Sequence, residues 1–105
     1  MKGKCVYVYR GEIEAAHYMT GVSSESGVHG HTWRIHVHVK EVEDLDKFRR
    51  DMEAILSRFD GEMLGDMGPR ELAEKIFELA SVLYPVVKVV VYMGRHLGVQ
   101  VKGNE

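Results

Sequence analysis

The sequence predicts an α+β domain in which two helices cover one face of a four-stranded antiparallel sheet. Three observations predict this class: two β-rich runs come first, two amphipathic helical segments occupy the middle, and two shorter β-rich runs follow. Strands that are consecutive in sequence can pair antiparallel through short connections. Each helical segment has one apolar stripe, so both helices can bury that stripe against the same sheet face.

The first two strands are expected at Lys4–His17 and from His29 to about Val42, with a polar loop between them. Gly11, inside the first run, could mark a bulge or a bend. The second strand alternates, with Trp33, Ile35, Val37 and Val39 on one face and Arg34, His36, His38 and Lys40 on the other. By this parity His36 and His38 face solvent or a channel between subunits.

The two helices are expected from Asp44 to Phe59 and from Pro69 to about Leu83. Asp44 is a favoured N-cap residue, and Pro69 suits the first turn of a helix. The apolar stripes comprise Leu45, Phe48, Met52, Ile55, Leu56 and Phe59 in the first helix, and Leu72, Ile76, Phe77, Leu79, Ala80 and Leu83 in the second. The last two strands are then expected at Val86–Met93 and Leu97–Val101, joined by the turn Gly94-Arg95-His96.

The composition indicates a single domain, residues 1–105, and argues against several classes of partner. A net charge of -2 without runs of like charge gives no basic footprint for nucleic acid. No apolar stretch approaches membrane-spanning length, because the longest, around Val86–Val91, is interrupted by Lys88. The single cysteine, Cys5, allows no internal disulfide, which predicts a reducing, cytoplasmic location. Four strands leave two open sheet edges, which favours a closed homo-oligomer.

A candidate metal site lies at the start of the second strand. His29 and His31 are two residues apart, so on an extended strand both imidazoles leave the same face, and Gly30 between them leaves room for close approach. A third imidazole from a neighbouring strand would complete a three-nitrogen site with one open coordination position, as in catalytic zinc sites. The alternative is a polar strand that is merely rich in histidine.

The element order, together with Ala15-Ala16-His17 and His29-Gly30-His31, resembles the 6-pyruvoyl-tetrahydropterin synthase family, which includes 6-carboxytetrahydropterin synthase of the queuosine pathway. The similarity extends from about Ile13 to Val101 and includes Asp44-Leu45 and the segment from Phe59 to Asp66. It implies the tunnelling fold, in which trimers close their sheets into a barrel and two trimers stack as a hexamer. It also implies Zn2+ held by His17, His29 and His31, and lyase activity on dihydroneopterin triphosphate or a related pterin.

Two positions of catalytic interest depart from the family pattern. Glu25 stands where the family's usual cysteine lies, four residues before His29, and would act as the general base. Some relatives that form a folate precursor have a glutamate one position later, where this chain has Ser26. Asp60 corresponds to the aspartate of the family's Asp-His pair and would serve as a relay or orienting residue, but Gly61 replaces the histidine. Glu25 could alternatively be a solvated loop carboxylate.

The positions that hold the pterin ring in the family also differ. Gly68-Pro69 and Met93 occupy them here, and they offer no side-chain partner to the donors of a pterin. His96 could replace the missing histidine across a subunit boundary. Either another group of the protein holds the ring, or the substrate is not a pterin. The expected partner is a small-molecule substrate, a pterin or a purine-like compound. The alternatives are a zinc-binding oligomer with altered ligand specificity or no catalysis, and a small structural domain with incidental histidines.

Overall fold

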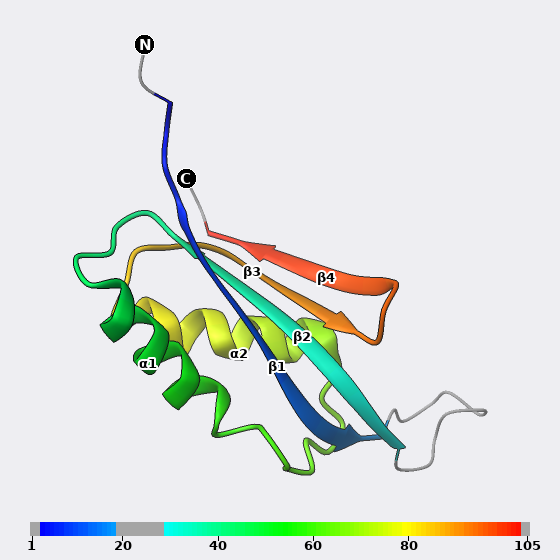
Figure 1. Ribbon diagram of the computed structural model, residues 1–105. Helices are drawn as coiled ribbons and strands as arrows, with labels where there is room; N and C mark the ends of the chain where they lie inside the picture. Colours follow the sequence, from blue (N-terminus) through cyan, green and yellow to red (C-terminus); the bar gives the residue numbers. More distant parts are fainter. Residues whose placement is uncertain (1–2, 19–28, 104–105) are drawn as a thin grey trace.

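The computed structural model describes residues 3–18 and 29–103 and has the predicted order of elements. The elements are β1 (Tyr7–His17), β2 (His29–Val39), α1 (Leu45–Leu56), α2 (Pro69–Ser81), β3 (Val86–Met93) and β4 (Leu97–Lys102). The four strands form one antiparallel sheet in the order β1-β2-β3-β4. Both helices lie on the same side of the twisted sheet (Figure 1), which confirms the predicted α+β class.

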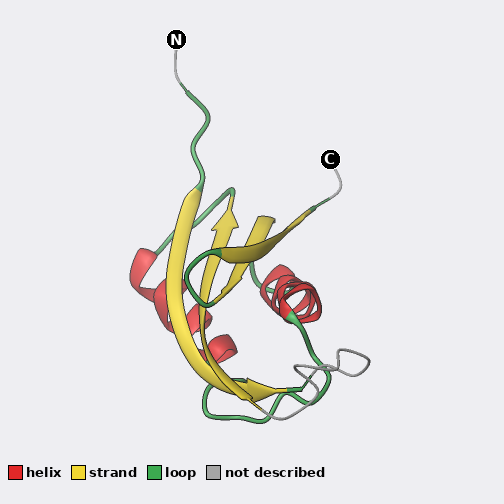
Figure 2. Ribbon diagram, turned by 90° about the vertical axis from the view of Figure 1, so that its right-hand side faces the viewer, coloured by secondary structure: helices red, strands yellow, loops and turns green. Residues whose placement is uncertain are grey.

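The long strands β1 and β2 pair along their whole length, and Figure 2 shows how strongly they curve. The possible bulge at Gly11 is wrong, since Gly11 pairs with Ile35 in an unbroken register. The glycine is needed for packing instead, because a Cβ atom there would lie 2.8 Å from the side chain of Leu56. The one register shift between β2 and β3 falls between His38 and Val39, at the end of β2.

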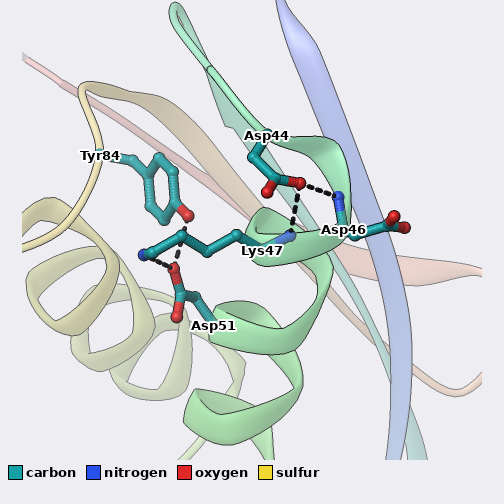
Figure 3. A network of polar contacts seen from close by, with 5 residues as sticks. All are labelled: Asp44, Asp46, Lys47, Asp51 and Tyr84. Carbon is teal, nitrogen blue, oxygen red and sulfur yellow. Dashed lines mark hydrogen bonds and ion pairs between the residues drawn. The ribbon is translucent and has the colours of Figure 1, made fainter.

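Helix α1 begins as predicted and ends earlier than predicted. Asp44 is the N-cap, and its Oδ1 accepts hydrogen bonds from the backbone N–H groups of Asp46 and Lys47 at 2.9 and 3.1 Å (Figure 3). The helix ends at Leu56, and Phe59 stays buried in the turn that follows. Leu45 was expected in the apolar stripe but is 62% exposed, because it is the first residue of the helix and lies beyond the sheet contact.

A polar network ties α1 to the segment that follows α2. The Tyr84 hydroxyl donates a hydrogen bond to Asp51 Oδ2 at 2.5 Å, and Lys47 Nζ contacts the same oxygen at 2.7 Å (Figure 3). These two hydrogen bonds, that of Lys47 first, hold the pKa of the Asp51 carboxyl below its usual value. Leu83, predicted to be buried, is exposed because α2 ends at Ser81 and the chain turns away before Tyr84.

The core lies between one face of the sheet and the two helices. Its sheet residues alternate along the strands, so that the opposite, polar face stays open to solvent. The core residues are Ile13, Ala15, Trp33, Ile35, Val37, Val39, Val89 and Val91 from the sheet, and Phe48, Met52, Ile55, Leu56, Phe59, Leu72, Ala73, Ile76 and Ala80 from the helices and the turn after α1. Within the described residues, no helix has the length and apolar character needed to span a membrane.

Candidate metal centre

The register of β1 against β2 places three histidines together. His17, the last residue of β1, is paired directly with His29, the first residue of β2. His31 is paired with Ala15 and therefore lies diagonally across from His17 on the same sheet face. His29 and His31 thus lie on the same face of β2, as predicted, and His17 on β1 is their neighbour across the strand pair. One strand pair therefore supplies all three imidazoles.

The three imidazole rings face one another closely. Their centroids are 4.5 Å apart for His17 and His29, 5.0 Å for His17 and His31, and 4.7 Å for His29 and His31. One ring nitrogen of each lies within 4.8 Å of those of the others, and the Nε2 atoms of all three are buried. Two nitrogens on one tetrahedral zinc lie about 3.4 Å apart at Zn–N distances of about 2.0–2.1 Å, so small side-chain rotations would bring these nitrogens to an ion.

His17 is fully buried and is oriented by the connector between the helices, residues 57–68. Its Nδ1 lies 3.0 Å from the backbone carbonyl oxygen of Met67. A carbonyl oxygen only accepts a hydrogen bond, so Nδ1 carries the donated proton, which leaves Nε2 as the ring nitrogen available to a metal. That Nε2 atom is buried without a hydrogen-bond partner among the described residues. A buried nitrogen of this kind, fixed by a bond at the other ring nitrogen, is what a metal ligand requires.

Trp33 closes the core side of the three-histidine cluster. Its ring centroid is 5.1 Å from that of His17 and 5.8 Å from that of His31, and its side chain has no solvent exposure. The indole Nε1 donates a hydrogen bond to the carbonyl oxygen of Ala15 at 3.1 Å, so the indole buries no unpaired donor. The cluster therefore has, on one side, an apolar wall that is not exposed to solvent, which strengthens electrostatic interactions at the centre.

A cleft of about 510 Å³ opens beside His31. It is lined by Glu14, Ala15, Ala16, Gly30, His31, Thr32, Gly61, Glu62 and Met63. The connector segment forms one wall by pairing with the end of β1, where Gly61 donates to the Glu14 carbonyl and Leu64 to the Ala16 carbonyl. The carboxylates of Glu14 and Glu62 are the acidic groups of this lining. The sequence could not predict that these two residues line a cleft, because the backbone pairing between β1 and a loop has no signature in the sequence.

Asp60 lies at the edge of this arrangement and makes a specific contact. Its Oδ1 accepts a hydrogen bond from the backbone N–H of Glu14 at 2.9 Å, and Thr32 Oγ1 donates to Glu14 Oε1 at 2.8 Å. The Asp60 carboxylate thereby holds the turn after α1 against β1. The role of Asp60 as a relay or orienting residue stays a prediction.

The other predicted site residues are distributed as follows. Glu25 lies outside the described residues. His36 and His38 lie on the polar face, opposite the three-histidine cluster, and His96 is exposed in the turn between β3 and β4. Met93 pairs in register with Trp33, and buried Gly68 follows Met67. Each is therefore next to a residue that contacts the cluster, and neither offers a polar side chain.

Comparisons with known sequences and with solved structures find the same family. The family model of 6-pyruvoyl tetrahydropterin synthase matches residues 7–91. The 6-pyruvoyl tetrahydropterin synthase of Caenorhabditis elegans superposes with a TM-score of 0.80 at 19% identity, over 95% of this chain and 96% of that one. The Plasmodium falciparum enzyme gives a TM-score of 0.68 at 10% identity, over 91% and 96% of the two chains.

A third structure is a catalytic-residue mutant of the Plasmodium vivax 6-pyruvoyltetrahydropterin synthase, in which a glutamate is replaced by alanine. It superposes with a TM-score of 0.69 at 10% identity, over 96% of this chain and 99% of that one. No curated protein matches the sequence at a significant level. The structural likenesses show a shared tunnelling fold, and the family match covers most of the sequence. The chain belongs to the 6-pyruvoyl tetrahydropterin synthase family.

Proposed function

We propose that this chain is a zinc-dependent carbon–oxygen lyase of the 6-pyruvoyl tetrahydropterin synthase type, acting on dihydroneopterin triphosphate or a related pterin. The observation that carries the proposal is the convergence of His17, His29 and His31, whose ligand nitrogens lie within 4.8 Å of one another at the edge of a cleft. Three histidines with an open fourth position are the donor set of a catalytic zinc site. Membership of the family supports a lyase that works in pterin metabolism.

Bound zinc would supply Lewis-acid chemistry, acidifying substrate hydroxyl groups that reach the open position. The chain's own residues then prepare the site. The Met67 carbonyl fixes the ring of His17 so that its Nε2 faces inward, and Trp33 excludes water from the core side. The cleft beside His31 would admit a ligand next to the cluster.

Glu25 is assigned as the general base that moves a proton between substrate carbon and oxygen. It stands four residues before His29, at the position of the family's cysteine. A carboxylate can act as a base when the carbon acid is activated by a nearby metal. The Plasmodium vivax structure supports a carboxylate in this chemistry, since the residue replaced there is a catalytic glutamate. Asp60 is assigned as a positioning residue, because its carboxylate holds the backbone N–H of Glu14.

The second candidate function is a zinc-binding oligomer of the same fold with altered ligand specificity or without catalysis. Met93 and Gly68 favour it, because they offer no side-chain acceptor to the amide and amino donors of a pterin ring. Each donor left unpaired on burial would cost about 1–3 kcal/mol. Glu14 and Glu62 line the cleft, and their carboxylates could accept hydrogen bonds from such donors of a pterin or a purine-like ring. A pterin bound in this way would favour the lyase again.

The proposed assembly is a homo-oligomer, a trimer or a hexamer, in the cytoplasm. Exposed apolar side chains support it: Val8 near the start of β1 is 47% exposed, and Leu97 at the start of β4 is 75% exposed. These residues lie on the two outer strands of the sheet, where another copy could continue the strand pairing. The cytoplasmic location follows from the single cysteine and remains part of the proposal.

The test is incubation of the zinc-loaded protein with dihydroneopterin triphosphate, followed by chromatography of the pterins. A pyruvoyl, carboxy or hydroxymethyl product is expected, and Glu25→Gln should lower the rate by about 10²–10⁴-fold while zinc is retained. Glu41→Gln, at an exposed position after β2, is the matched control and should leave the rate unchanged. Stoichiometric zinc without turnover would overturn the lyase and favour the non-catalytic alternative.

A further inference from the structure

The sheet face that the helices leave uncovered carries basic groups directly opposite one another. Arg10 on β1 is paired with His36 on β2. In the neighbouring row, His38 on β2 is paired with Lys88 on β3, and Lys88 with Lys102 on β4. Like charges directly opposite on neighbouring strands destabilise a sheet. The register therefore concentrates cationic side chains on this face, although the chain as a whole has a net charge of -2.

The acidic groups of the same face lie in the next two rows of the sheet, and one of them, Glu12, also borders a hollow beside Arg10. Glu12 occupies the next row towards the metal centre and is paired with Arg34, whose Nε lies 3.3 Å from Glu12 Oε1. Glu14 lies one row further and accepts the hydrogen bond from Thr32. Within the described residues, no ion pair links a carboxylate to Arg10, Lys88 or Lys102, the three permanent cations of the two basic rows.

Two hollows accompany these rows. One, of about 570 Å³, is lined by His38, Lys88 and Lys102, together with Val6, Val87 and Gly103. The other, of about 210 Å³, is lined by Arg10, Gly11, Glu12, Arg34 and His36. Each is large enough for a tetrahedral oxyanion, and each has basic groups from at least two strands.

We propose that the two hollows bind free inorganic oxyanions of the phosphate or sulfate type, separate from the metal centre, at His38, Lys88 and Lys102 in the larger hollow and at Arg10 and His36 in the smaller one. Charge complementarity carries the proposal: the two basic rows together hold three permanent cations and two groups that become cationic when protonated. This inference does not depend on the proposed lyase activity, because these residues lie on the opposite sheet face from His17, His29 and His31.

The two histidines should make this binding depend on pH. Burial, and then the neighbouring Arg10, lowers the pKa of His36, whose ring also lies 6.0 Å from that of Tyr92. Burial, then Lys88 and His36, lowers the pKa of His38. A bound oxyanion would offset the repulsion and favour the protonated rings, so it should raise both pKa values. Binding should therefore strengthen as the pH falls, by about tenfold between roughly pH 8 and pH 5.

The test uses NMR titration of the imidazole signals in the complete protein, with sulfate as the probe because its charge is constant over this range. His36→Gln and His38→Gln assign the two signals. Sulfate is expected to raise the pKa of both histidines above the values in sodium chloride at the same ionic strength. Equal pKa values in the two salts would overturn the proposal, because they would show only general screening.

Charge variants locate the site. Lys88→Gln should weaken sulfate binding roughly two- to fivefold and reduce the sulfate-induced shift of His38 most. Lys75→Gln, which removes one exposed charge from α2 on the helical side, is the matched control and should change neither. If Lys88→Gln fails to fold, Lys102→Gln on the edge strand serves in its place. Equal effects of the control and of the β3 or β4 variant would contradict a local site.

Discussion

The Nδ1 atom of His17 lies 3.0 Å from the backbone carbonyl oxygen of Met67, fifty residues further along the chain. This contact links the last residue of β1 to the connector just before α2. It fixes the tautomer of the buried histidine and turns Nε2 towards His29 and His31. The connector between the helices therefore does more than join them, because it orients one of the three proposed zinc ligands.

Zinc should stabilise the folded chain strongly. An ion that binds only the native state stabilises it by about 4.1 kcal/mol when it is present at roughly 1,000 times its dissociation constant. For a domain of about 100 residues, that corresponds to an increase in Tm of more than about 10 °C. The measurement is thermal unfolding with zinc and with an excess of chelator. His17→Ala should abolish the difference, whereas a difference that persists in this variant would contradict the assigned ligand.

Two glycines in the sheet should respond differently to substitution by alanine. A Cβ atom on Gly98 would lie 2.7 Å from the backbone oxygen of Val91, so β3 and β4 would have to separate. A Cβ atom on Gly30 would meet nothing within 4 Å among the described residues. Gly98→Ala is expected to lower the free energy of unfolding by about 1–3 kcal/mol, and Gly30→Ala to change it by less than about 0.5 kcal/mol. Urea denaturation compares them, and equal effects would mean that the close approach at Gly98 is wrong.

The Asp51 network should make stability sensitive to acid. The hydrogen bonds from Lys47 and Tyr84 lower the pKa of Asp51 in the folded state. A lowered folded-state pKa adds stability above the unfolded value of about 3.9, and this is lost as the pH falls through the folded value. The difference in unfolding free energy between the native chain and Asp51→Asn should therefore shrink below about pH 4. A difference that stays constant from neutral to acidic pH would contradict this account.

Tyr84→Phe tests the same network without changing a charge. It removes the hydrogen bond to Asp51 and should cost about 0.5–1.5 kcal/mol of unfolding free energy at neutral pH. Glu53→Gln is the control, because its ion pair with Arg49 is exposed on α1 and should contribute less than about 0.5 kcal/mol. Urea denaturation compares the two, and an equal or larger loss in Glu53→Gln would overturn the role given to Tyr84.

Asp60 can be assigned as a positioning residue by two substitutions. Asp60→Asn keeps an oxygen that accepts from the Glu14 N–H, whereas Asp60→Ala loses it. If Asp60 only positions the turn after α1, the asparagine variant should retain most of the kcat and the pH profile of the native protein in the proposed reaction. The alanine variant should lose activity and unfold more easily. Loss of kcat in Asp60→Asn at unchanged stability would instead assign the carboxylate to proton transfer.

Much of this fold follows from local patterns. The alternation from Trp33 to Val39 predicts both the strand and the face on which its side chains lie, and Asp44 predicts the start of α1. The end of α1 could not be predicted in the same way. Phe59 is buried like the residues of the helical stripe, yet it lies in the turn after Leu56. Periodicity cannot distinguish another helical turn from an irregular turn that keeps the same residue against the core.

The sequence indicates which histidines could bind a metal, but it does not indicate which groups surround them. The spacing of His29 and His31 predicts that they share a face, but the pairing of His17 with His29 depends on the register across the intervening loop. The Met67 carbonyl is a backbone group, which any residue would supply, so no pattern could indicate it. The cleft wall likewise depends on the connector pairing with β1, a long-range contact without a periodic signal.

The most direct test of the central claim is the zinc content of the purified protein, measured by elemental analysis in the native chain, His29→Ala and His36→Ala. The three-histidine centre predicts one zinc per chain in the native protein and in His36→Ala, because His36 lies on the opposite sheet face. His29→Ala should contain none, since two imidazoles are too few to hold the ion against water. Full zinc occupancy in His29→Ala, or loss of zinc in His36→Ala alone, would contradict the assignment.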